Sequence, residues 1–188
     1  MKRGTLVFLA DRDGENFCRY TMLEGALHGG LGVAAAGLPR HISLGLPYDV
    51  PDFDAYLRFA EKLAARLHPI EVRLNGMKAN PIGSATGNYC FTFETQEDVD
   101  ALRSMTVRAL RGELGLDVPE KDGVTGTRNI TLGFGKAPFD AYKAFVDGAG
   151  QAAFMGKTLR FDELGVFYYD EATIGANNFF CCKRIPLK

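Results

Sequence analysis

The sequence has few of the features that mark a secreted, membrane-bound or metal-dependent protein. Its 188 residues include only three histidines, and its four cysteines have no metal-ligand spacing. Thiols without a disulfide framework fit a reducing compartment, so we expect a cytoplasmic protein. No stretch approaches the roughly 20 apolar residues of a membrane span, and the apolar run near the amino terminus is too short for a signal peptide. The sequence therefore predicts no membrane association, no metal and no cofactor.

A strong charge of either sign is also missing. The formal net charge is −1, from 22 basic and 23 acidic residues. Such a balance provides no basic field for a long nucleic acid, so a nucleic-acid ligand should be a terminus or a small fragment. The glycine-rich residues 29–32 and 133–136 lack the spacing of a dinucleotide fingerprint or a phosphate-binding loop. An apolar content of 46% and the length favour one compact unit over residues 1–188.

A short strand pattern is present twice in the chain. Residues 40–46 read Arg-His-Ile-Ser-Leu-Gly-Leu, and residues 128–134 read Arg-Asn-Ile-Thr-Leu-Gly-Phe. Alternate residues of a strand share a face, so the apolar residues of each copy should point into a core. We expect a polar face on each strand, formed by His41, Ser43 and Gly45 in the first copy and by Asn129, Thr131 and Gly133 in the second. The two faces predict one site built from two halves.

The duplication extends beyond these strands. Residues 53–59 read Phe-Asp-Ala-Tyr-Leu-Arg-Phe and residues 139–145 read Phe-Asp-Ala-Tyr-Lys-Ala-Phe, and each follows shortly after a proline suited to a first helical turn. Two looser matches follow in the same order, between residues 72–75 and 159–162 and between residues 88–91 and 178–181. We infer two homologous lobes, each strand–helix–strand–strand, over roughly residues 40–93 and 128–183.

The remaining patterns complete an α+β protein. The spacing of apolar residues predicts a helix from Phe53 to Leu67, a second helix from a cap at residues 95–98 to about Gly112, and a third from Pro138 to near Gly148. Residues 20–28 are consistent with another helix, which the glycines after it would end. We expect two pseudo-symmetric lobes, each an antiparallel sheet with helices outside, around a central groove.

The paired strands resemble the motifs of the 2H phosphoesterases, a family that includes the 2′-5′ RNA ligase-like and cyclic phosphodiesterase proteins. Paired His-x-Ser/Thr strands about ninety residues apart, each in a duplicated α+β lobe, are typical of that family, and the resemblance covers nearly the whole chain. It implies a metal-free site for 2′,3′-cyclic or 2′-5′ phosphoesters of RNA ends or nucleotides. It also implies that His41 is catalytic and that Ser43 and Thr131 bind phosphate. Asn129 stands where the family has its second histidine.

The chemistry of the reaction makes Asn129 important. Opening a cyclic phosphate needs a base for the attacking water and an acid for the leaving oxygen, and histidine suits both roles near neutral pH. Asparagine can donate a hydrogen bond to a phosphoryl oxygen, but it cannot transfer a proton. Losing one general acid or base costs roughly 10²–10⁴ in rate. We therefore expect impaired or altered activity, with Asn129 as a third phosphate-binding residue.

Three hypotheses follow for the function. The first is a slow phosphoesterase in which water or another group, such as His28 in its glycine-rich segment, replaces the second histidine. The second is a non-catalytic protein that binds a nucleotide or an RNA terminus, which the retained hydroxyls of Ser43 and Thr131 favour. The third is a scaffold for protein contacts, although no surface in the sequence marks one and the protein partners are unknown.

Several other residues have a plain structural interpretation. Arg40 and Arg128 alternate away from the polar faces, so we expect surface or inter-strand salt bridges from them. Lys136 could reach a phosphate at the mouth of the groove, but a solvated lysine is the default. Tyr89 and Phe91 share a strand face and could stack on a base. Core packing is the simpler expectation for that pair.

Overall fold

The computed structural model of the chain describes residues 2–33, 37–83, 85–95, 99–118, 129–170 and 180–188. These residues form an α+β fold with an eight-stranded sheet in which all strand pairs are antiparallel, as the sequence predicts for the fold class. The elements in chain order are β1 Lys2–Ala10, α1 Arg12–Gly29, β2 His41–Ser43, β3 Tyr48–Asp49, α2 Phe53–Ala64, β4 Ile70–Ile82, β5 Thr86–Thr95, α3 Val99–Leu114, β6 Asn129–Pro138, α4 Phe139–Gly148, a 3-10 turn Gln151–Ala153, β7 Thr158–Asp170 and β8 Phe180–Pro186.

The helices form near the predicted positions, for identifiable local reasons. Asp11 accepts a hydrogen bond from the Gly14 amide at 2.8 Å and begins α1, which therefore starts well before the predicted residue 20. Asp52 caps α2 in the same way, and Pro138 precedes α4. Helix α3 runs to Leu114, close to the predicted end. Of the predicted cap at residues 95–98, Thr95 is the last residue of β5 and residues 96–98 lie outside the described residues.

The strand order places the repeated segments symmetrically along the sheet. The path through the sheet is β2-β1-β7-β4-β5-β6, with β3 beside β1 and β8 beside β7. The two motif strands, β2 and β6, therefore occupy opposite ends of the path. Its centre is the β4–β7 pair, which joins residues 70–73 to residues 158–161. The looser match at residues 72–75 and 159–162 thus falls on the two central strands.

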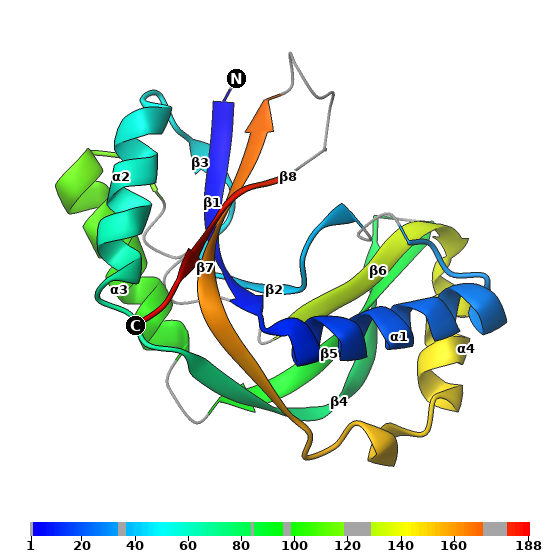
Figure 1. Cartoon of the computed structure of the whole chain (residues 1–188). Coiled ribbons are helices and arrows are strands. Elements are labelled where there is room, and N and C mark those ends of the chain that lie inside the picture. The colour runs from blue at the N-terminus through cyan, green and yellow to red at the C-terminus, as the bar shows by residue number, and fades with distance from the viewer. Residues whose placement is uncertain (1, 34–36, 84, 96–98, 119–128, 171–179) are drawn as a thin grey trace.

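The strand pairs cross the boundaries of the two sequence repeats. Strand β2 belongs to the first sequence repeat but pairs with β1, while β6 of the second repeat pairs with β5 of the first. The helices are exchanged too. Helix α3 follows β5 but lies beside α2, and α1 follows β1 but lies beside α4 on the opposite flank (Figure 1). Neither residues 40–93 nor residues 128–183 form a separate half of the molecule.

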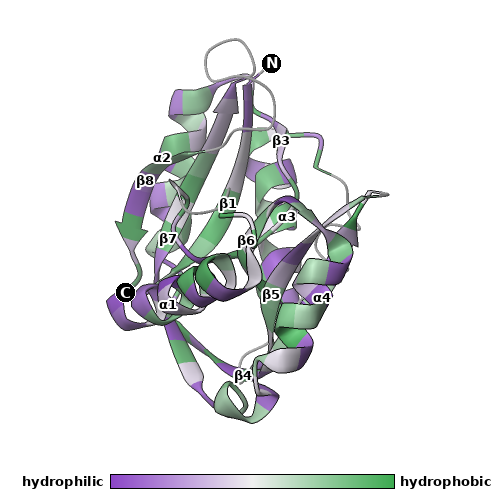
Figure 2. Cartoon of the chain, turned by 90° about the vertical axis from the view of Figure 1, so that its right-hand side faces the viewer, coloured by the Kyte–Doolittle hydropathy of each residue, from purple (hydrophilic) through white to green (hydrophobic). Residues whose placement is uncertain are grey.

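The core lies between the sheet and these two helix pairs. Ile42 and Leu44 of the first motif and Ile130 and Leu132 of the second are at most 1% exposed, so the inward faces are confirmed for these four residues. The prediction is wrong for the last apolar residue of each copy, because Leu46 is 65% exposed and Phe134 is 38% exposed. The tyrosines of the repeated Phe-Asp-Ala-Tyr segments, Tyr56 and Tyr142, are fully buried as well. Figure 2 views the molecule from the side of α1 and α4, which lie in front of β5 and β6. Much of the duplication therefore specifies packing.

Candidate functional site

The two motif strands keep their polar residues on the face away from the core. In β2, His41 and Ser43 are half-buried while Ile42 between them is fully buried. In β6, Asn129 and Thr131 alternate in the same way with Ile130 and Leu132. The structure therefore places all four predicted site residues on equivalent faces of two strands.

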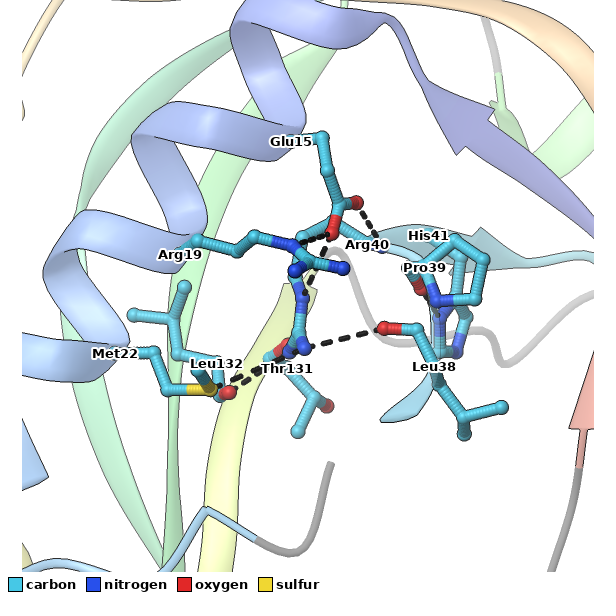
Figure 3. A network of polar contacts seen from close by, with 9 residues as sticks. All are labelled: Glu15, Arg19, Met22, Leu38, Pro39, Arg40, His41, Thr131 and Leu132. Atoms are coloured by element: carbon cyan, nitrogen blue, oxygen red, sulfur yellow. Dashed lines mark hydrogen bonds and ion pairs between the residues drawn. The ribbon is translucent and has the colours of Figure 1, made fainter. Parts of the chain in front are cut away.

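Arg40 links the two motif strands, although they lie far apart in the sheet order. Its guanidinium Nη1 donates hydrogen bonds to the Thr131 carbonyl oxygen at 3.1 Å and to the Leu132 carbonyl oxygen at 2.8 Å (Figure 3). Because Arg40 directly precedes His41, these bonds bring the start of β2 beside the middle of β6. Of the two alternatives expected for Arg40, the surface one is wrong, because its side chain is only 2% exposed, and its contact is between strands, through hydrogen bonds. The matching Arg128 lies outside the described residues.

The environment of His41 fixes its protonation state. Its Nδ1 lies 2.8 Å from the carbonyl oxygen of Pro39. A carbonyl oxygen only accepts hydrogen bonds, so Nδ1 carries the proton and Nε2 presents a lone pair. Burial lowers the pKa of His41 to about 4, the hydrogen bond to Pro39 opposes this shift, and the nearby charge of Arg40 adds to it. His41 is therefore neutral at pH 7, with Nε2 ready to accept a proton.

The hydroxyl-bearing residues are held through their backbones. The Ser43 carbonyl oxygen accepts a hydrogen bond from the Nε of Arg103 at 2.9 Å, and the Thr131 carbonyl oxygen accepts the bond from Arg40. In the part of the chain that the structure describes, neither the Ser43 nor the Thr131 hydroxyl has a hydrogen-bond partner. Both hydroxyls can therefore donate to an anionic ligand.

The strands next to the motif strands make the two halves of the site chemically different. Beside His41 and Ser43, β1 contributes Leu9 and Val7, which pack on Phe167 in a small apolar cluster. The edge of the Phe167 ring meets the His41 ring at a centroid distance of 4.6 Å. The side chains that surround His41 in this half of the site are therefore apolar.

The other half of the site is polar. Beside Asn129 and Thr131, β5 contributes Thr92 and Cys90 in the equivalent positions. One strand further, Lys78 of β4 is paired with Cys90. The sequence analysis missed Lys78 and Cys90, because only the register of β4 and β5 aligns them with the second motif.

A β-bulge changes one of the predicted faces. The register between β5 and β6 shifts so that Thr131 opposes Cys90 while Gly133 opposes Tyr89, whose ring is in the core. A Cβ on Gly133 would lie 3.0 Å from that ring and 2.7 Å from the Gly32 carbonyl oxygen. The prediction that Gly133 shares the polar face is therefore wrong, because the extra residue of the bulge turns it inward.

The other candidates lie in ordinary environments. His28 is not in a loop but in the last turn of α1, exposed and 3.4 Å from the Glu24 carboxylate. Tyr89 and Phe91 are fully buried, as the core interpretation predicted. Lys136 is an exposed residue of β6. Among the described residues no group of three or more His, Cys, Asp or Glu side chains could hold a metal ion. Nor is any described helix long and apolar enough to cross a membrane.

Solved structures share this architecture over the whole chain. Comparison of the sequence with protein-family models finds no match, and comparison with curated proteins finds none either. By structure, the protein TT0787 of Thermus thermophilus aligns with a TM-score of 0.64 at 16% identity, covering 98% of this chain and 97% of that one. The chain has the fold of the 2H phosphoesterases.

Two further proteins with this fold align at similar scores. Usb1 of Kluyveromyces marxianus gives a TM-score of 0.57 at 12% identity, with 98% of each chain covered. Escherichia coli LigT in complex with 3′-AMP gives a TM-score of 0.55 at 13% identity, covering all of this chain and 98% of that one. In each of these comparisons the likeness covers at least 98% of this chain.

Proposed function

We propose that the protein binds and slowly cleaves 2′,3′-cyclic or 2′-5′ phosphoesters at RNA ends or in nucleotides, with no metal in the reaction. The observation that carries this proposal is the neutral His41, whose Nε2 lone pair lies on a strand face shared with Ser43. The second strand, with Asn129 and Thr131, is joined to the first through Arg40. The 2H phosphoesterase fold, and the presence of 3′-AMP in the LigT structure, support a nucleotide as the ligand.

The proposed reaction uses His41 as a general base. Nε2 of His41 takes a proton from a water molecule as the water oxygen attacks phosphorus, and the P–O bond to one ribose oxygen breaks on the opposite side. The hydroxyls of Ser43 and Thr131 and the Asn129 amide donate hydrogen bonds to the phosphoryl oxygens, where charge develops. Asn129 cannot supply a proton to the leaving oxygen, so that proton comes from solvent. This step is the reason to expect slow turnover.

A second candidate function is nucleotide binding without turnover. It is favoured by Asn129 together with the two available hydroxyls, since donors alone are enough to hold a phosphate group. The two candidates differ only in whether the His41 lone pair is used for chemistry.

Turnover of nucleoside 2′,3′-cyclic monophosphates and 2′-5′ dinucleotides by three forms of the protein separates these candidates. We expect slow turnover by the wild type, none by His41→Ala, and an increase of at least about tenfold in Asn129→His, because a second imidazole restores an acid. Nucleotide binding should be measured in parallel by calorimetry. Saturable binding without turnover in any form would identify a binding protein, and undiminished turnover in His41→Ala would refute the mechanism.

A further inference from the structure

Arg40 is an unusual residue to find directly before a catalytic histidine. Its side chain is only 2% exposed, although it carries a positive charge. Burying a guanidinium costs free energy unless hydrogen bonds and an opposite charge compensate for it. The side chain points away from the polar face of β2, towards α1 and β6 (Figure 3).

Glu15 of α1 holds Arg40 from one side. One carboxylate oxygen accepts a hydrogen bond from the Arg40 backbone amide at 2.5 Å, and the other lies 4.0 Å from the guanidinium Nε. That second oxygen also accepts a hydrogen bond from the Nε of Arg19 at 2.6 Å. The Glu15 carboxylate therefore hydrogen-bonds the main chain of Arg40 and lies at ion-pair distance from its side chain (Figure 3).

Besides its contact with the Met22 sulfur, the guanidinium donates hydrogen bonds to backbone carbonyls around the site. Two reach Thr131 and Leu132 of β6, and a third runs from Nη2 to the Leu38 carbonyl oxygen at 3.1 Å. The Arg40 carbonyl oxygen in turn accepts a hydrogen bond from the Ala10 amide at 2.9 Å. A displacement of Arg40 would therefore move β2 relative to β6, and Ser43 relative to Thr131.

Fold stability alone does not account for this arrangement. Apolar residues of similar volume often replace a buried ion pair with no loss of stability. An apolar side chain would, however, leave the Thr131 and Leu132 carbonyl oxygens without the bonds that tie them to β2. The contacts thus set the distance between β2 and β6, which are not neighbours in the sheet.

We propose that Arg40, held by Glu15, is a positioning residue that sets the spacing at which the Ser43 and Thr131 hydroxyls bind one phosphate group together. This inference rests on the proposed phosphate site and extends it to a residue that touches neither ligand nor reacting atoms. It makes binding by one hydroxyl depend on the presence of the other. Lysine at position 40 keeps the charge, but its single ammonium nitrogen cannot reproduce the bonds that two guanidinium nitrogens make to β6 and to Leu38.

The test is a double-mutant cycle for the affinity of 3′-AMP, measured by calorimetry. The cycle combines Ser43→Ala and Thr131→Ala in the wild type, in Arg40→Lys and in Arg19→Lys. In the wild type and in Arg19→Lys, we expect the effect of Ser43→Ala on the Kd to differ by about fivefold or more between proteins with and without the Thr131 hydroxyl. In Arg40→Lys the two substitutions should be nearly independent, so that the effect of one on the Kd changes by no more than about 1.5-fold when the other is present. Arg19 is the matched control because it also donates to Glu15 but is exposed.

A purely structural role for Arg40 would lower stability without changing this coupling. Circular dichroism and thermal melts establish that each variant is folded. If Arg40→Lys does not fold, Glu15→Gln loosens the same contact from α1, and an intermediate coupling of about twofold is expected. Full coupling in the folded variant would overturn the inference alone. No binding of 3′-AMP by the wild type would overturn the proposed function and this inference together.

Discussion

The imidazole of His41 is arranged to accept a proton and not to supply one. Its Nδ1 hydrogen is committed to the Pro39 carbonyl oxygen, and burial keeps the ring neutral. In a site with two histidines, one can act as base while the other acts as acid. Here the second position is Asn129, so under the proposed function the site has a base without a partner acid. Under that proposal, Asn129 is the residue that separates a slow enzyme from a binding protein.

The low pKa of His41 predicts a specific pH dependence of stability. The pKa falls from 6.5 to about 4 on folding, so between these values the unfolded chain binds more protons than the native state. The resulting stabilisation is fully present above about pH 6.5 and is lost as the pH falls towards about 4, by about 1–3 kcal/mol. Urea unfolding of wild type and His41→Gln across this range measures it. A wild-type profile parallel to that of His41→Gln would contradict the low pKa.

The contact between the end of α1 and strand β6 depends on glycines. After α1, the chain passes so close to β6 that a Cβ on Gly32 would lie 2.4 Å from the Gly135 Cα atom and 2.6 Å from the Phe134 carbonyl oxygen. Both atoms belong to the backbone and cannot move aside cheaply. The glycine-rich segment, which resembled a nucleotide-binding loop only in composition, has this structural purpose.

Substitution of Gly32 should therefore be costly. We expect Gly32→Ala to lower the free energy of unfolding by about 1–3 kcal/mol, the usual cost of overpacking. Gly112 of α3 is the matched control, because a Cβ there meets no atom within 4 Å. Gly112→Ala should leave stability unchanged or raise it by about 0.5–1 kcal/mol. Urea titrations of both variants give the comparison, and equal stabilities would refute the close contact.

The register of three neighbouring strands brings β4 into line with the second motif strand. Lys78 pairs with Cys90, which pairs with Thr131, so three residues form one row across the sheet. Strand spacing puts the Lys78 and Thr131 Cα atoms about 10 Å apart. Burial raises the pKa of the Cys90 thiol, whereas a hydrogen bond from Asn80 and the charge of Lys78 oppose that rise. The positive charge of Lys78 therefore acts on Cys90, which is the neighbour of Thr131 in the sheet.

Removing this charge should weaken the binding of an anionic ligand. We expect Lys78→Met to raise the Kd for 3′-AMP about three- to tenfold and to reduce its salt dependence, with Lys78→Arg close to wild type. Lys62, an exposed lysine in the last turn of α2, provides the control. If Lys78→Met and Lys62→Met bind equally well, Lys78 lies outside the binding face.

At the scale of the whole molecule, elements of the two sequence repeats pack on one another. Helix α2 of the first repeat contacts β7 and β8, helix α4 of the second contacts β4 and β5, and β6 pairs with β5. Cutting the chain between the repeats would therefore divide the site as well as the core. Binding of a ligand to both motif strands should stabilise the entire fold and not one part of it.

Ligand-induced stabilisation tests this global coupling. At 3′-AMP concentrations of about 100 times Kd, we expect the free energy of unfolding to rise by about 2.7 kcal/mol in a single transition. Ser43→Ala and Thr131→Ala should each reduce the gain at the same ligand concentration, because each weakens binding. Thermal melts followed at two wavelengths provide the measurement. Two separate transitions, only one of them shifted by ligand, would show that the halves unfold independently.

The sequence by itself determined the duplication, the inward and outward faces at residues 41–44 and 129–132, the approximate helices and the difference between His41 and Asn129. These features follow from residue spacing along one strand or helix, where periodicity alone assigns a face. Tertiary structure decided the exchange of elements, the inward turn of Gly133, the row that includes Lys78 and the burial of Arg40. Each of these depends on pairing between distant segments or on removal of a charged group from water, and local spacing contains neither. The same holds for the proton on Nδ1 of His41, which the carbonyl of Pro39 fixes only in the folded chain.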